Sequence, residues 1–114
     1  RDPDPRQIDA LCHFSFSDVA TSEINTDAYT KATAVEGGED RVRRELDKIL
    51  HTALRGSGLG LAVYAGHGLT VGNVKPIAAI PEIEELNIGH SIVSRASLVG
   101  MRAAVREMLD AITP

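Results

Sequence analysis

The chain has 114 residues, with 12 basic and 16 acidic side chains, a net charge of −4 and few aromatic residues. This length fits one compact domain or part of a larger one. The acidic balance argues against a nucleic acid or an anionic membrane surface as the main partner. No apolar run approaches the length of a membrane span, and no charged leader with an apolar core is visible. We therefore expect neither membrane insertion nor export.

Cys12 is the only cysteine, which excludes a disulfide within the chain and favours a reducing compartment. We expect Cys12 to be an inert, buried thiol. The four histidines are not spaced as two metal ligands on one face of a helix, so we expect no metal site.

The N-terminal third of the sequence predicts a helix, a strand and a loop. Asp4 suits the N-cap of the helix, and Pro5 suits its first turn. A polar strand is expected over residues 18–24. A loop rich in Thr, Ala and Gly is expected over residues 25–38.

The clearest helix lies over residues 39–54. Its apolar side chains form one stripe, while its charged side chains face water. Gly56 and Gly58 are expected to end the helix. The apolar stripe contains Val42, Leu46, Ile49, Leu50 and Ala53.

An apolar run and a short helical pattern follow. Residues 59–65 are continuously apolar, which is typical of a strand buried on both faces of a parallel sheet. A helix is expected over residues 70–80, and Pro76 implies that this helix is kinked or begins late.

The last part of the sequence predicts a strand over residues 85–88 and a helix over residues 91–112 that breaks near Gly100. The alternation of helices and strands predicts parallel strands with right-handed crossovers. Three parallel strands cannot close a barrel, and as an open sheet they would expose two edges. We therefore predict an α/β fold in which residues 1–114 form one partial domain of a barrel, rather than a reduced α/β domain.

Two short apolar runs of the sequence end in Gly-His, at residues 66–67 and 89–90. Glycine lets a ligand approach the main chain closely, and histidine can move a proton near neutral pH. His67 also precedes Gly68, which adds accessible backbone donors and favours a functional role. The alternative is that His67 only caps its strand through a backbone hydrogen bond.

The second Gly-His opens the last helical pattern, where Gly89, His90 and Ser91 follow one another. A helix N-terminus offers free N–H groups and a partial positive charge, which suit a phosphate. In α/β barrels the phosphate site often follows the last two strands. The alternative is that Ser91 only caps the helix.

A carboxylate, a lysine and two further histidines are weaker candidates for chemistry. Glu23 ends the polar strand, where a carboxylate could stabilise positive charge or orient a histidine, although it could also be a solvated glutamate. Lys75 invites a Schiff-base interpretation, but it falls on a helix and is expected to be a surface lysine. His13 and His51 fit no pattern.

Residues 58–108 include the runs Ala-Gly-His-Gly-Leu-Thr from Ala65 and Glu-Leu-Asn-Ile-Gly-His-Ser from Glu85. Over this range the sequence closely and almost continuously resembles the pyridoxine 5′-phosphate synthase family. Residues 2–8 resemble the segment after the family's fifth barrel strand, and residues 23–29 resemble its sixth-strand segment.

The resemblance implies that the chain is the C-terminal part of a (β/α)8 TIM barrel, supplying its last three β/α units. It also implies the condensation of 1-deoxy-D-xylulose 5-phosphate with 3-amino-2-oxopropyl phosphate, which yields pyridoxine 5′-phosphate, inorganic phosphate and water. Members of the family are cytoplasmic homo-oligomers, typically octamers, and need no metal or organic cofactor.

The resemblance assigns roles by position. His67 corresponds to the proton donor, and Glu23 to the glutamate that stabilises the transition state. Gly68, Gly89 and His90 correspond to residues that bind 3-amino-2-oxopropyl phosphate.

The sequence departs from the family in two ways. The first half of the family's barrel, which carries the other catalytic histidine and glutamate, has no counterpart here. Asn25-Thr26-Asp27 stands where the family usually reads His-Thr-Gly. Three interpretations are open: a synthase completed by a homo-oligomer or by a missing N-terminal half-barrel, an incomplete barrel fragment that binds a phosphorylated ligand or a partner subunit, or another phosphate-binding barrel enzyme.

Overall fold

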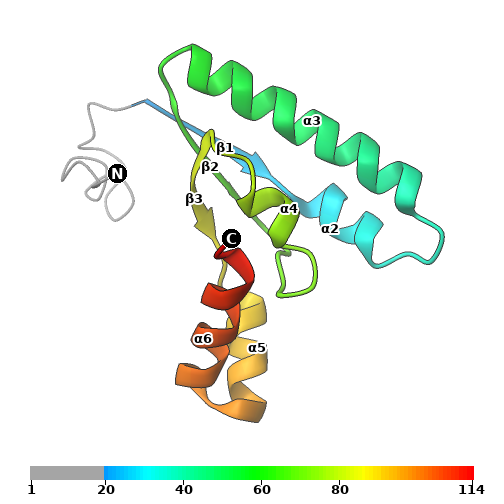
Figure 1. The fold of residues 1–114 in the computed structure, drawn as a ribbon, viewed down its shortest axis with the longest axis vertical. Helices are drawn as coiled ribbons and strands as arrows, with labels where there is room; N and C mark the ends of the chain where they lie inside the picture. Colours follow the sequence, from blue (N-terminus) through cyan, green and yellow to red (C-terminus); the bar gives the residue numbers. More distant parts are fainter. Residues whose placement is uncertain (1–19) are drawn as a thin grey trace.

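A computed structural model describes residues 20–114, which form three strands and five helices (Figure 1). In chain order these elements are β1 (Thr21–Asn25), α2 (Asp27–Thr33), α3 (Glu39–Gly58), β2 (Ala62–Gly66), α4 (Lys75–Ala78), β3 (Ile83–Asn87), α5 (His90–Val99) and α6 (Met101–Ile112). The predicted N-terminal helix, Cys12 and His13 lie outside the described residues.

The three strands form one parallel sheet in the order β1-β2-β3, which confirms the predicted α/β class and the parallel arrangement. Glu23 of β1 lies opposite Tyr64 of β2, and Tyr64 lies opposite Glu85 of β3. Within residues 20–114 no further strand pairs with the outer edge of β1 or β3. The carboxyl ends of all three strands therefore meet at one end of an open sheet.

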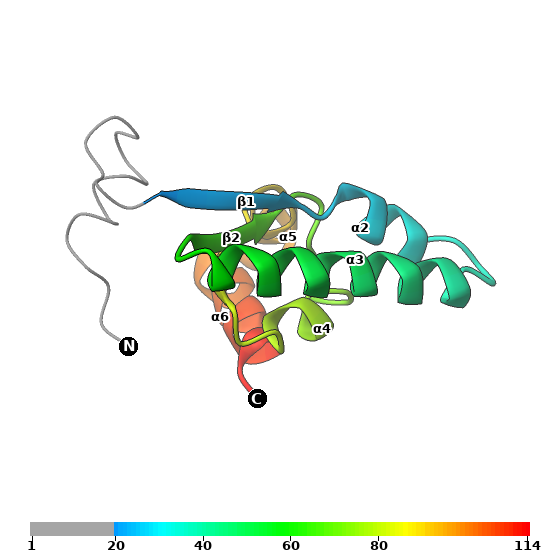
Figure 2. The same ribbon diagram turned by 90° about the horizontal axis from the view of Figure 1, so that it is seen from above.

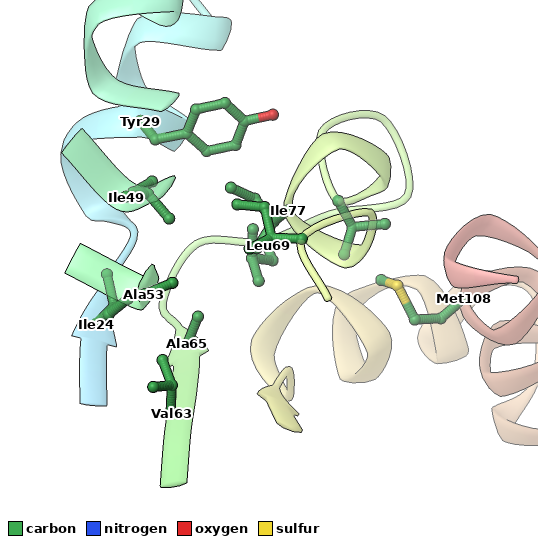
Figure 3. Packing of buried hydrophobic residues seen from close by; sticks show 11 residues of the cluster. Ile24, Tyr29, Ile49, Ala53, Val63, Ala65, Leu69, Ile77 and Met108 are labelled. Atoms are coloured by element: carbon green, nitrogen blue, oxygen red, sulfur yellow. The ribbon is translucent and has the colours of Figure 1, made fainter. Parts of the chain in front are cut away.

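Helix α3 runs along one face of β1 and β2 (Figure 2), and α5 and α6 form a helical pair at the other end of the molecule (Figure 1). The apolar core lies between the sheet and the helices, and Figure 3 shows Ile24 and Ala65 from the sheet with Ile49 and Ala53 from α3. Burial of these side chains fixes which face of the sheet carries the helices.

Residues alternate between the two faces of a strand. Glu23, Tyr64 and Glu85 therefore share one row on the face opposite to Ile24 and Ala65. Burial raises the pKa of the Glu85 carboxyl, and burial together with the charge of Glu85 raises the pKa of Tyr64. Among the described residues, Oε2 of Glu85 is buried without a hydrogen-bond partner.

The apolar stripe predicted for α3 is confirmed, except that Leu50 is exposed. The predicted helix end is wrong, since α3 continues through Gly58. Gly56 is buried inside the helix, where a Cβ atom would lie 3.0 Å from Cγ2 of Val63. Gly56 therefore lets α3 approach the sheet instead of ending the helix, and β2 begins three residues later than predicted.

The loop predicted over residues 25–38 is wrong in part, because Asp27–Thr33 form α2. Tyr29 and Ala32 of this helix are buried. The Tyr29 hydroxyl donates a hydrogen bond to the carbonyl oxygen of Asn73 at 2.5 Å. Tertiary packing of this kind overrides weak local propensity, so the composition of the segment was misleading.

The remaining elements lie close to their predicted positions. Pro76 is in the first turn of α4, so the helix begins late, which was one of the two expected outcomes. Gly100 separates α5 from α6 at a φ of +90°, which confirms the predicted break. Strand β1 begins at Thr21 and β3 at Ile83, each a few residues from the predicted start. No helix within residues 20–114 has the length and apolar character to cross a membrane.

Candidate active site

The carboxyl ends of the three strands border one cavity of about 830 Å³. Its wall comes from β1, from the segment after β2 and from the junction between β3 and α5. The lining residues are Glu23, Asn25, Gly66, His67, Gly68, Leu69, Thr70, Asn87, Ile88, Gly89, His90 and Ser91.

All five residues predicted for the site lie in this wall. They are Glu23, His67, Gly68, Gly89 and His90. The two Gly-His segments are more than 20 positions apart in the sequence, but the parallel sheet places both strand ends at the same edge. The structure thus brings the predicted residues together, while their chemical roles stay predictions.

The backbone of His67 has an unusual conformation. Its φ of +99° is positive, and no other non-glycine residue between positions 20 and 114 has a positive φ. Residues with a side chain rarely adopt this region, and such strain often occurs at functional sites. The hydroxyl of Thr26 donates a hydrogen bond of 2.6 Å to the carbonyl oxygen of His67. The backbone N–H of Thr26 donates to the carbonyl oxygen of Gly66 at 2.9 Å.

The imidazole of His67 faces a carboxylate. Its Nε2 atom lies 3.3 Å from Oδ1 of Asp27, and 64% of the His67 side chain is exposed. Oδ2 of Asp27 lies 2.8 Å from Nζ of Lys31. The hydrogen bond from Lys31, aided by the charges of Lys31 and His67, lowers the pKa of Asp27 below its ordinary value. The ring therefore lies beside a carboxylate that stays ionised at neutral pH.

The glycines of the site have different functions in the fold. A Cβ atom at Gly66 would lie 2.6 Å from the carbonyl oxygen of Asn87, and one at Gly68 would collide with Oγ1 of Thr30. Packing alone therefore requires these two glycines. A Cβ atom at Gly89 would have no described atom within 4 Å apart from those of its chain neighbours, so Gly89 leaves its backbone open to a ligand.

The alternative that Ser91 only caps helix α5 is wrong. Gly89 is the N-cap residue, and within residues 20–114 no side chain caps the helix there. The hydroxyl of Ser91 instead donates to the carbonyl oxygen of Leu69 at 2.7 Å. The first turn of α5 thus borders the cavity with its N–H groups and its partial positive charge.

Asn73 was missed by sequence reasoning, although it orders the segment after β2. Its side chain is buried. Its Oδ1 accepts a hydrogen bond from the N–H of Thr70 at 2.7 Å, and its Nδ2 donates to the carbonyl oxygen of Gly68 at 3.4 Å. An asparagine a few residues after a strand is a common turn former, and that signal was available in the sequence.

The other candidates lie as follows. The exposed side chain of Glu23 accepts a long hydrogen bond, 3.5 Å, from Nδ2 of Asn87 across the sheet. Lys75 is exposed at the first position of α4, away from the lining of the cavity, as expected for a surface lysine. His51 is exposed on α3.

Comparison of the sequence with known proteins identifies its relatives. Residues 1–114 match the family model described as pyridoxal phosphate biosynthesis protein PdxJ. The chain is 49% identical over 111 residues to the pyridoxine 5′-phosphate synthase of Syntrophotalea carbinolica, which covers 97% of the chain and 44% of that relative. It is 48% identical over 116 residues to the synthase of Photobacterium profundum, with 96% and 44% covered.

A third relative, the pyridoxine 5′-phosphate synthase of Cyanothece sp., is 51% identical over 90 residues, which are 79% of the chain and 36% of the relative. The chain thus spans less than half the length of these relatives. This share, together with three parallel strands in an open sheet, agrees with the predicted C-terminal part of a TIM barrel. Because the family model matches the whole sequence, the chain belongs to the PdxJ family of pyridoxal phosphate biosynthesis proteins.

Proposed function

We propose that this chain supplies the C-terminal part of a pyridoxine 5′-phosphate synthase active site. The reaction condenses 1-deoxy-D-xylulose 5-phosphate with 3-amino-2-oxopropyl phosphate and yields pyridoxine 5′-phosphate, inorganic phosphate and water. The observation that carries the proposal is the convergence of His67, Glu23 and the first turn of α5 on one cavity. The names of the similar proteins support the same activity.

The first turn of α5 is proposed to bind the phosphate of 3-amino-2-oxopropyl phosphate. Gly89 and His90 line the cavity there, and Gly89 leaves room beside its backbone. A dianion is stabilised by the free N–H groups and the partial positive charge of a helix N-terminus. Gly68 lies in another part of the same wall and would contact the same substrate.

His67 is proposed to donate a proton to the reacting substrate. Its imidazole is largely exposed, lies at the edge of the cavity and is held beside the Asp27 carboxylate. An imidazole in its protonated form can act as a general acid. Proton donation to a departing oxygen would assist the loss of water or of phosphate.

Glu23 is proposed to stabilise positive charge that develops on the substrate nitrogen during condensation. It lies in the cavity wall, and its side chain contacts Asn87 of β3 from β1. A carboxylate in this place is complementary to a protonated amine or iminium group. No metal or organic cofactor enters the proposed reaction.

The rest of the barrel is proposed to come from further β/α units, either in a homo-oligomer or in a separate N-terminal half-barrel, in the cytoplasm. A second candidate function is an incomplete barrel fragment that binds a phosphorylated ligand or a partner subunit without turnover. It is favoured by the two outer strand edges that remain unpaired within residues 20–114 and by the short share of the relatives that the chain covers.

One experiment separates the two candidates. The chain is incubated with both substrates, alone and with the separately expressed N-terminal half of a relative, and pyridoxine 5′-phosphate is measured. Product in either mixture supports the synthase. Binding of 3-amino-2-oxopropyl phosphate by calorimetry, without product in either mixture, supports the fragment. If neither product nor binding is detected, both proposals are contradicted.

A further inference from the structure

Both the backbone and the ring of His67 contact the junction between β1 and α2. At its backbone, the positive φ of +99° is an uncommon conformation for a residue with a side chain. Such a conformation persists only where surrounding contacts hold it. Two residues of the β1–α2 junction, Thr26 and Asp27, make those contacts.

Thr26 holds the backbone of His67. Its side chain is fully buried, at 0% exposure, and its hydroxyl donates to the carbonyl oxygen of His67 at 2.6 Å. Its N–H donates to the preceding carbonyl oxygen, that of Gly66, at 2.9 Å. Thr26 therefore binds two consecutive carbonyl groups at the point where β2 ends and the chain turns toward the cavity.

Asp27 holds the ring of His67. Its Oδ1 lies 3.3 Å from Nε2, and its other oxygen lies 2.8 Å from Nζ of Lys31. The backbone N–H of Asp27 donates to Oδ1 of Asn25 at 2.8 Å, which orders the start of α2. A carboxylate facing one ring nitrogen favours the tautomer with its proton on that nitrogen.

The geometry points to Thr26 and Asp27 as positioning residues that aim the imidazole of His67 at the substrate. This inference rests on the proposed function and adds two residues to it. Thr26 sets the direction in which the side chain leaves the backbone. Asp27 sets the rotation of the ring and holds the proton on Nε2, so that the second proton of the charged ring, the one donated to the substrate, is carried on Nδ1. Neither residue is required to touch the substrate.

The test of Thr26 uses two variants in the preparation that forms pyridoxine 5′-phosphate. Thr26→Val has nearly the same shape but no hydroxyl, and Thr26→Ser keeps the hydroxyl. We expect kcat to fall by about tenfold in Thr26→Val, with KM for 3-amino-2-oxopropyl phosphate within about twofold of wild type, and near-normal kcat in Thr26→Ser. Equal loss in both variants, or loss in KM alone, would overturn the role of Thr26.

Asp27 is partly exposed, unlike Thr26, so a substitution there tests the contact with His67 without disturbing the buried core. Asp27→Asn keeps the shape and removes the charge, and Lys31→Gln is the matched control because it removes the other partner of Asp27. We expect kcat to fall by about fivefold in Asp27→Asn and by less than twofold in Lys31→Gln. Each variant is also combined with His67→Asn, on which Thr26→Val and Asp27→Asn should add no further loss if they act through His67. Full additivity would contradict the inference.

A spectroscopic measurement separates this inference from the activity. The ¹⁵N resonances of the His67 ring report which nitrogen carries the proton. We expect the Nε2-protonated tautomer to lose population in Asp27→Asn and to keep it in Lys31→Gln, whether or not product forms. If wild type shows no synthase activity but the tautomer shifts as expected, the proposed function fails and the positioning contact stands. An unchanged tautomer in Asp27→Asn overturns the contact itself.

Discussion

The hydroxyl of Ser91 donates a hydrogen bond to the carbonyl oxygen of Leu69 at 2.7 Å. This contact joins the segment after β2 to the first turn of α5, so it connects the two Gly-His strand ends. Leu69 is itself buried in the apolar core, close to Ile77 (Figure 3). The part of the cavity wall that follows β2 is thus attached to the core, and the start of α5 is attached to that part.

Ser91→Ala is expected to loosen the start of α5 and weaken the binding of 3-amino-2-oxopropyl phosphate by about fivefold, since one hydrogen bond contributes roughly 1 kcal/mol. Affinity is measured by calorimetry. The matched control is Ser97→Ala on the same helix, because the hydroxyl of Ser97 donates to the carbonyl of Ser94 within α5. Equal effects of the two substitutions would show that Ser91 has no special function in the cavity.

Gly89→Val is expected to weaken the binding of 3-amino-2-oxopropyl phosphate by about tenfold or more while leaving the thermal midpoint near wild type. A Cβ atom at Gly89 would meet no described atom within 4 Å apart from those of its chain neighbours, and the added side chain would occupy space in the cavity. Gly58→Val is the control, because Gly58 also has open space around it but lies at the end of α3. Unchanged affinity in Gly89→Val would remove this turn of α5 from the phosphate site.

His67→Asn is expected to slow turnover by about 10²-fold in the preparation that forms product, which is the typical contribution of a general acid. His51→Asn serves as the control, since His51 is exposed on α3. The kcat of each variant is measured by the formation of pyridoxine 5′-phosphate. A near-normal rate in His67→Asn would exclude His67 as the proton donor.

Tyr29→Phe is expected to lower the free energy of unfolding by roughly 1–3 kcal/mol, because it leaves the buried carbonyl of Asn73 without the Tyr29 hydroxyl. Urea unfolding gives this quantity. Thr33→Ala is a milder comparison, because the Thr33 hydroxyl bonds to the carbonyl of Thr30 within its own helix. A loss in Tyr29→Phe no greater than in Thr33→Ala would show that α2 does not depend on this bond.

Glu85→Gln is expected to stabilise the protein at neutral pH. Burial raises the pKa of Glu85 above its ordinary value of 4.5, so the folded state keeps the proton to higher pH than the unfolded chain does. Stability is then lost as the pH rises from the unfolded toward the folded pKa, and glutamine avoids that loss. Urea unfolding should show an advantage at neutral pH that disappears below pH 4.5.

Glu36→Gln is the control for Glu85→Gln, since Glu36 is exposed in the loop between α2 and α3. It should leave the free energy of unfolding unchanged across the same pH range. A Glu85→Gln variant that is less stable than wild type at neutral pH would mean that the carboxylate has a stabilising partner.

Five of the residues that line the cavity were predicted from the sequence, because local patterns place them at the strand ends. Two apolar runs end in Gly-His, and parallel strands bring such ends together. The contacts of Thr26 and Asp27 with His67 join positions about 40 residues apart. No periodicity encodes such a pairing, so it appears only when the chain is folded. Helix α2 was missed for the same reason, because the burial of Tyr29 stabilises it from outside the segment.

The close approach of Gly66 to the backbone of Asn87 limits how the cavity can be redesigned. A methyl group at this position would lie 2.6 Å from the carbonyl oxygen of Asn87, which belongs to the main chain and cannot rotate aside. Randomised libraries at position 66 should therefore return only glycine. A Cβ atom at position 89 meets no such obstacle, so the fold accepts a side chain there, but that side chain would occupy the space proposed for the phosphate.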